Sequence, residues 1–169
     1  MASAILYLAT GLVWAGRSLL EVLLHPEYWD PVTTVDFIAV WSSSLAFALT
    51  AVAVPLIARD AGAGRLALVT SLVVGACATL AALGNIVEDA FGQSSWSSVY
   101  VIGALGTLLG LIALAVLLAI ARRPGSALAI FLIVAGMAMS SSGLGVLALA
   151  GTVIAARDRL AGEADGPVR

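Results

Sequence analysis

RSLLEVLLHPEYWDPVTTVD, residues 17–36, separates two long apolar segments of the chain. The chain as a whole is 62% hydrophobic and only 11% charged. The ionisable side chains of this short stretch are Arg17, Glu21, His25, Glu27, Asp30 and Asp36. The stretch is therefore expected to contain both the first turn of the fold and part of a polar site.

Composition predicts a membrane protein. The mean hydropathy is +1.10, and apolar runs recur that are long enough to cross a hydrocarbon core of about 30 Å. We predict an all-α, polytopic membrane protein of the cell membrane, built as a bundle of five transmembrane helices with short loops. One transmembrane domain is expected over residues 1–156, with spans at about 3–24, 32–58, 66–88, 98–121 and 127–156 and a polar tail at 157–169.

Several classes of site are excluded or not supported. The net charge is −2, with no basic patch to bind nucleic acid. A single cysteine, Cys77, cannot form an intrachain disulfide or a CxxC metal site. With His25 as the only histidine, a transition-metal site is not predicted. Nucleophile-elbow, P-loop and Rossmann motifs are absent, so no cofactor is predicted.

The first helix is expected to carry a polar stripe along one face. Trp14, Arg17, Glu21 and His25 are spaced 3, 4 and 4 residues apart, which places them on the same side. Arg17 and Glu21 are expected to face inward and to pair, which would lower the free energy of placing either in a bilayer. Such a pair could serve to lock helices together or to form a functional site. The helix should end at His25, because the residue before Pro26 is disfavoured in the α conformation.

The second helix is expected to begin after Pro31, with Thr33 or Thr34 as its N-cap. Its helical period places Asp36, Val40, Ser43, Phe47 and Thr50 on one stripe. Asp36 could serve only to favour the helix N-terminus through the helix dipole. It could also border a cavity.

The third span ends in Asn85, Glu88 and Asp89. The basic turns RDAGAGR, residues 59–65, and ARRPGS, residues 121–126, are expected on one membrane face. The positive-inside rule makes that face, and the N-terminus with it, cytoplasmic. The acidic ends of the first three helices would then meet on the outer side.

The last apolar segment, residues 127–156, contains GMAMSSSGLG near its middle. A re-entrant hairpin would give two halves too short to span a membrane. One tilted helix is therefore favoured, although it places the arginines of RDR, residues 157–159, on the outer side, against the charge rule.

Carboxylates crowded at a low-dielectric boundary cannot all ionise at low cost, so at least one is expected to keep its proton. Such an acid beside an apolar cavity could protonate an alkene or epoxide, and aromatic faces could stabilise the resulting cation. This chemistry predicts an acid-initiated cyclase or isomerase of an isoprenoid-like substrate. The candidate catalytic residues are Glu21, Asp36, Glu88 and Asp89. The candidate substrate-binding residues are Trp14, Arg17, His25, Trp41, Asn85 and Tyr100.

Two other functions remain open. Intramembrane acids also mark proton or cation paths, so the chain could be a small coupled transporter, for which an oligomer would be expected. It could instead be a non-catalytic membrane subunit whose small-residue helix faces pack against a partner. The expected partners are thus a hydrophobic small molecule or lipid, membrane lipids, and either further copies of the chain or a partner membrane subunit.

Overall fold

The computed structural model describes residues 1–26 and 31–164, and within these ranges the chain is helical, without strands. The prediction of an all-α chain is confirmed. The α-helices are α1 (Ala2–Leu24), α2 (Thr34–Asp60), α3 (Arg65–Asn85), α4 (Ser97–Ile120), α5 (Pro124–Ala138) and α6 (Val146–Ala164). Short helical turns η1 (Ile86–Ala90), η2 (Ser94–Trp96) and η3 (Ser140–Ser142) join some of them.

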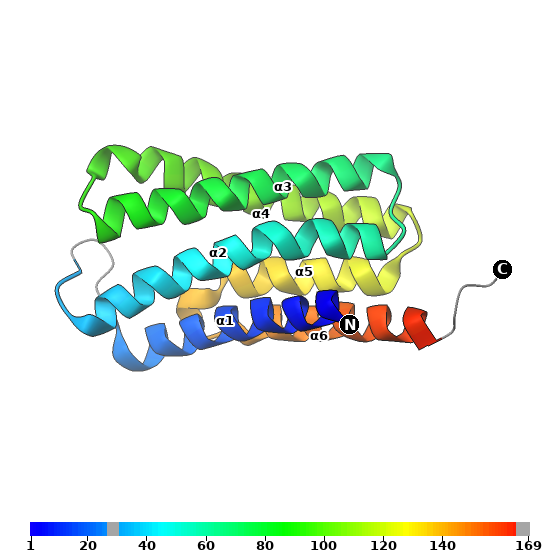
Figure 1. Ribbon diagram of the computed structural model, residues 1–169, viewed down its shortest axis with the longest axis horizontal. Coiled ribbons are helices and arrows are strands. Elements are labelled where there is room, and N and C mark those ends of the chain that lie inside the picture. The colour runs from blue at the N-terminus through cyan, green and yellow to red at the C-terminus, as the bar shows by residue number, and fades with distance from the viewer. Residues whose placement is uncertain (27–30, 165–169) are drawn as a thin grey trace.

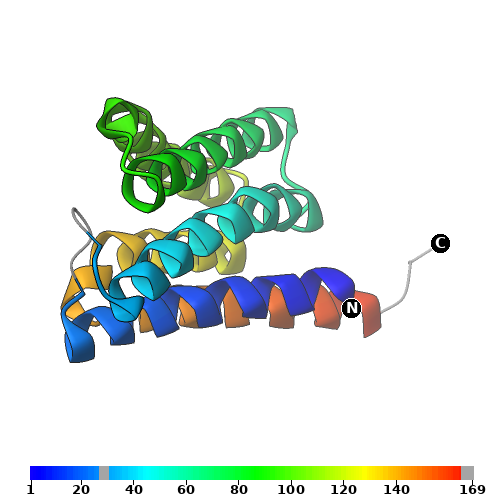
Figure 2. The same ribbon diagram turned by 60° about the vertical axis from the view of Figure 1, so that its left-hand side comes forward.

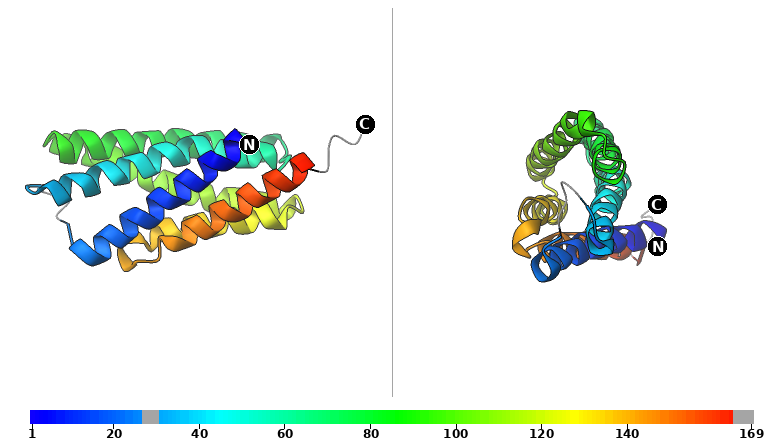
Figure 3. Two further views of the ribbon diagram at one scale, coloured as in Figure 1. Left: turned by 60° about the horizontal axis from the view of Figure 1, so that its bottom comes forward. Right: turned by 90° about the vertical axis from the view of Figure 1, so that its left-hand side faces the viewer.

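The α-helices run alternately in opposite directions and close into a ring (Figure 1). Each helix packs on its neighbours in the chain, and α1 closes the ring against α6. The end-on view in Figure 3 shows this arrangement around a common interior. Four stretches are long and apolar enough to cross a membrane: Ala2–Leu24, Thr34–Asp60, Arg65–Ala90 and Ser94–Ile120. Helix α5 is apolar but shorter.

The expectation of one helix over residues 127–156 is wrong. The segment forms a hairpin of α5 and α6, visible side by side in Figures 1 and 2. Gly143 has a φ of +79°, in the left-handed region that glycine tolerates, and turns the chain back. Both helices continue beyond the apolar segment, so α5 has 15 residues and α6 has 19. Within the described residues, neither is among the stretches that are long and apolar enough to cross a membrane.

Because of this hairpin, the arginines of α6 lie at the same end of the bundle as those of α2, α3 and the α4–α5 turn. Apart from Arg17, the arginines in the described part of the chain lie at the C-termini of α2 and α6, the N-terminus of α3 and the turn between α4 and α5. These are Arg59, Arg65, Arg122, Arg123, Arg157 and Arg159. All occupy the end of the bundle that also holds the N-terminus (Figure 1). We call this the arginine end. A single last helix would have placed the arginines of residues 157–159 at the opposite end, against the positive-inside rule. The hairpin places them with the other arginines, so this conflict does not arise.

Close approach of α5 and α6 depends on glycine. A Cβ placed on Gly151 would lie 2.4 Å from the carbonyl oxygen of Ala129, and one on Gly136 would lie 2.4 Å from the backbone nitrogen of Ala148. A methyl group at either site meets backbone, which cannot move aside as a side chain can. By contrast, a Cβ on Gly16 in α1 meets nothing within 4 Å.

Gly151→Ala should therefore destabilise the protein, while Gly16→Ala should not. Overpacking against backbone is expected to lower the free energy of unfolding by about 1–3 kcal/mol. Alanine in place of an exposed helical glycine should raise it by up to about 1 kcal/mol. Thermal unfolding of both variants in detergent measures the difference, and equal midpoints would contradict the close packing of α5 on α6.

Candidate functional site

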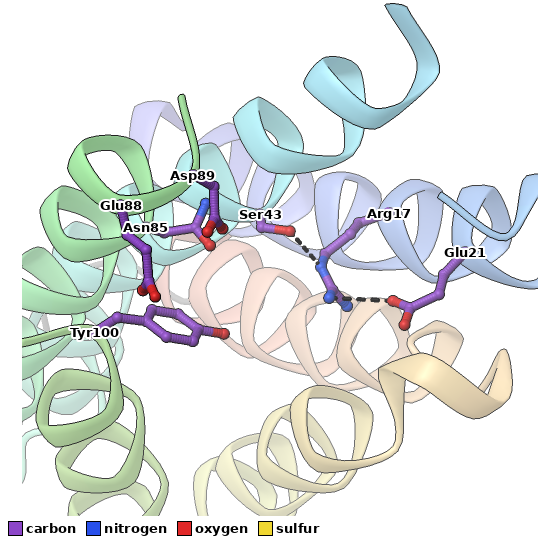
Figure 4. Close-up of a pocket in the computed structure, with 7 residues that line it drawn as sticks. All are labelled: Arg17, Glu21, Ser43, Asn85, Glu88, Asp89 and Tyr100. Carbon is purple, nitrogen blue, oxygen red and sulfur yellow. Dashed lines mark hydrogen bonds and ion pairs between the residues drawn. The ribbon is translucent and has the colours of Figure 1, made fainter. Parts of the chain in front are cut away.

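Arg17 lies at the centre of a polar network inside the ring. Its Nε donates to Ser43 Oγ at 2.7 Å and its Nη1 to Ser140 Oγ at 2.5 Å. Its Nη2 lies 3.1 Å from Glu21 Oε2, and both side chains are largely buried. Figure 4 shows the guanidinium between Ser43 and Glu21. The expectation that Arg17 and Glu21 face inward and pair is confirmed. One guanidinium thus links α1, α2 and the α5–α6 connection.

Ser18 fixes the same connection from the next position in α1. Its hydroxyl donates to the carbonyl of Ser140 at 2.5 Å and accepts from the backbone N–H of Gly145 at 3.0 Å. A Cβ on Gly145 would lie 2.4 Å from Ser18 Cβ, so only glycine allows this approach. The break between α5 and α6 is therefore bonded to the helix that carries Arg17, which holds Ser140 in reach of the guanidinium.

A pocket of about 150 Å³ opens beside Arg17. Its lining comes from α1, α2, α3, η1 and α4 and consists of Arg17, Glu21, Ser43, Asn85, Glu88, Asp89 and Tyr100. In Figure 4, Glu88 and Asp89 of η1 lie on the opposite side of the pocket from Glu21, the one acid of α1. Three carboxyl groups face one guanidinium here, so the lining carries more acid than it can neutralise internally.

A second pocket of about 170 Å³, lined mainly by aromatic and aliphatic residues, adjoins the first and shares Arg17 and Tyr100 with it. Its other lining residues are Trp14, Phe47, Ala104, Leu108, Met137, Ala138 and Ser140. Phe47 meets Trp14 and Tyr100 edge to face, at centroid distances of 5.3 Å and 6.2 Å. The Trp14 indole N–H donates to Thr50 Oγ1 at 3.0 Å, which fixes its ring. Together the two pockets offer an acidic end and an aromatic end. We call them the Arg17 site.

The acids of the third span sit in an irregular turn. Glu88 and Asp89 belong to η1, a π-helical turn that continues α3. Turns of this kind are frequent at functional sites. The hydroxyl of Ser97 donates to Glu88 Oε1. Asn85 is buried one turn earlier and donates to the carbonyl of Val40 at 3.0 Å, which joins α3 to α2 below the acids.

The structure brings together most of the residues that the sequence indicated. Trp14, Arg17, Glu21, Asn85, Glu88, Asp89 and Tyr100 all line one or both pockets. Asp36 does not line them. Its Oδ2 accepts from the backbone N–H and the hydroxyl of Thr33, each at 2.7 Å, in a capping box at the start of α2. The expectation that Asp36 borders the same cavity is therefore wrong, because its carboxylate is used to cap the helix.

Two further candidates also lie away from the pockets. His25 is exposed at the C-cap of α1, where it adopts a left-handed φ of 45° and its N–H bonds to the carbonyl of Glu21. Trp41 is half exposed and lines an apolar groove between α2 and α3 on the outer surface of the ring. Glu27 and Asp30, expected near the same site, lie outside the described residues.

Sequence reasoning missed Ser43, Phe47, Met137 and Ser140 as site residues. Ser43 and Phe47 were placed on one stripe of the second helix together with Asp36, so the helical period already indicated that they share a face. Ser140 and Met137 come from a segment more than a hundred residues from Arg17, and no local pattern pairs them with it. Within the described residues, no group of three or more His, Cys, Asp or Glu side chains is placed to hold a metal ion.

No protein-family model, characterised protein or solved structure matches this chain. A function has to be inferred from the Arg17 site itself.

Arg17→Met should destabilise the protein strongly, because it leaves Glu21 in a largely buried position without its cation. Breaking such a pair on one side typically lowers the free energy of unfolding by about 3–5 kcal/mol. Because the Arg17 and Glu21 side chains are still partly exposed, the expected loss in the free energy of unfolding is near the lower value. The double variant Arg17→Met with Glu21→Leu should recover much of it, since no buried charge is then left unpaired.

Asp36→Asn is the comparison for this prediction, because weakening a helix cap costs about 1 kcal/mol. Thermal unfolding in detergent should rank Arg17→Met as the least stable, with Asp36→Asn and the double variant above it. A double variant no more stable than Arg17→Met, or an equal loss for Asp36→Asn, would contradict the role given to the pair.

Proposed function

We propose that the chain is a multi-pass membrane protein that binds a hydrophobic small molecule in the Arg17 site and catalyses its acid-initiated isomerisation or cyclisation. The single observation that carries this proposal is the junction of an acidic pocket with a second pocket that has aromatic walls. A proton donor at one end and an apolar wall at the other are what an alkene or epoxide substrate requires.

The charge distribution along the bundle supports the membrane placement that we propose. Four stretches can span a bilayer, and six arginines gather at one end of them. By the positive-inside rule the arginine end, with the N-terminus, faces the cytoplasm in the cell membrane. The Arg17 site then lies toward the outer leaflet, where a hydrophobic substrate can enter from the lipid.

The contacts of the acids divide their roles. Glu21 is the counter-ion of Arg17, and Asp36 is a helix cap. Glu88 accepts a hydrogen bond from the Ser97 hydroxyl. We assign the proton donor to Asp89, which is adjacent to Glu88 and lines the same pocket.

In the proposed reaction the Asp89 carboxyl group transfers its proton to a substrate alkene carbon or epoxide oxygen. The carbocation that forms lies against the faces of Trp14, Phe47 and Tyr100, which stabilise positive charge through their π-electrons. Loss of a proton from the substrate back to a carboxylate ends the reaction, so atoms and charge balance without a cofactor. Pairing with Glu21 offsets the charge of Arg17, which would otherwise repel the cation.

One observation favours proton or cation coupling as a second candidate. Polar side chains continue along the buried face of α1 from Arg17 through Thr10 to Tyr7, whose hydroxyl donates to Asp60 at the arginine end. Buried polar groups of this kind mark ion paths in membrane proteins. The packed rings of Trp14 and Phe47 interrupt this series, which is why the enzyme is preferred.

Asp89→Asn should abolish product formation from short isoprenoid alkenes or epoxides, while Asp36→Asn should not. Loss of a general acid is expected to lower the rate by about 10²–10⁴-fold. The purified variants would be incubated with the substrates and the products separated by gas chromatography. Unchanged product with both Glu88 and Asp89 neutralised would refute the acid mechanism. Proton uptake in vesicles that depends on Asp89, with no product, would favour transport instead.

The orientation is tested by cysteine labelling in intact cells. Gln93→Cys, in the α3–α4 connection, should react with a membrane-impermeant thiol reagent added from outside. Gly64→Cys, at the arginine end, should react only after lysis, because the lipid barrier excludes the reagent. The native Cys77 lies midway along α3 and is the background control in unsubstituted protein. The opposite labelling pattern would overturn the orientation.

A further inference from the structure

We infer that the arginine end carries a second binding site, for the phosphate group and one acyl chain of an anionic phospholipid. The site is a groove of about 390 Å³ where the ends of α1, α2 and α6 meet. Its lining residues are Met1, Ala2, Ser3, Leu6, Leu56, Arg59 and Arg159. None of these lines the Arg17 site, which lies toward the other end of the bundle.

The groove has a cationic rim and an apolar floor at matching depths. On α2, Leu56 precedes Arg59 by three residues, and on α1, Leu6 follows Ser3 by three. Since the two helices are antiparallel, each leucine lies about 4.5 Å deeper in the bundle than the polar residue at its end. A phospholipid has the same order, with the phosphate at the rim and hydrocarbon below it.

Asp60 organises the rim. Its Oδ2 lies 3.1 Å from Arg159 Nε and accepts from the Tyr7 hydroxyl at 2.8 Å. Its Oδ1 lies 3.4 Å from both Nε and Nη2 of Arg59. One largely buried carboxylate thus holds two guanidinium groups from different helices on the groove. The Arg59 side chain is 63% exposed and has five N–H donors, more than Asp60 engages.

Charge complementarity selects the occupant. Arginine at a membrane surface attracts anionic lipid headgroups by about 1 kcal/mol per side chain, or about five-fold in affinity. A free phosphate would leave Leu6 and Leu56 uncovered, and a zwitterionic lipid would add a cation beside the arginines. The inference depends on the proposed membrane placement and is independent of the chemistry at Asp89.

The experiment titrates the purified full chain in detergent with phosphatidylglycerol and counts bound lipid by native mass spectrometry. Phosphatidylcholine of the same acyl chains and soluble glycerol phosphate are the two comparison ligands. Wild type should bind one phosphatidylglycerol in preference to phosphatidylcholine, and glycerol phosphate at the same concentration should not displace it. Arg59→Gln should weaken phosphatidylglycerol binding about five-fold.

Arg65→Gln is the matched control, since it removes the same charge from an exposed site at the same end but outside the groove. It should leave binding of the one preferred phosphatidylglycerol unchanged. Equal weakening by Arg65→Gln, or equal binding of phosphatidylcholine, would show a diffuse surface attraction and overturn the site. Displacement by glycerol phosphate would overturn the lipid assignment. Asp89→Asn should bind phosphatidylglycerol as wild type does, so failure of the enzymatic proposal can be told apart from failure of this one.

Discussion

The structure depends on how a guanidinium is accommodated inside an apolar ring of helices. A charge in a low-dielectric interior is unfavourable unless it is paired and hydrogen-bonded. Arg17 meets this requirement with partners from three parts of the chain: Glu21 in its own helix, Ser43 in α2 and Ser140 in the α5–α6 connection. The same contacts determine where α1 lies relative to its neighbours and keep the interior open beside the guanidinium.

Away from the cavity beside Arg17, the helices pack closely through small residues. In a membrane, helix association relies on van der Waals contact and hydrogen bonds more than on the hydrophobic effect. Glycines at the α5–α6 contact bring backbone against backbone, and Gly103 in α4 does the same against Ala81 of α3. Where larger side chains meet instead, as Trp14, Phe47 and Tyr100 do, the ring retains a cavity with aromatic walls.

The two ends of the bundle differ in charge and in the ligands that we propose for them. Acids of α1 and η1 face the Arg17 site at one end, and arginines of α2 and α6 border a groove at the other. In our proposal an uncharged hydrophobic substrate enters from the outer leaflet. Anionic lipid of the cytoplasmic leaflet binds the opposite end of the protein and fixes its depth in the membrane. The contact of lipid with the arginine end would thereby set the depth at which the Arg17 site opens to the bilayer.

The sequence by itself determined the all-helical class, the position of the first turn at His25–Pro26 and the pairing of Arg17 with Glu21. These follow from local physics: apolar runs favour helices, proline ends one, and residues four apart on a helix share a face. It also identified Glu88 and Asp89 as acids at the end of the third span, together with Asn85 one turn earlier.

Only the tertiary structure decided the rest. Asp36 satisfied the sequence pattern both for a cap and for a cavity acid, and the orientation of its carboxylate toward Thr33 selects the cap. The turn at Gly143 could not be told from a loosened helix, because glycine and serine permit both conformations and packing of α6 on α1 and α5 selects the hairpin. Ser140 joined the site for the same reason: a contact across 123 residues is set by how helices pack, which no local spacing encodes.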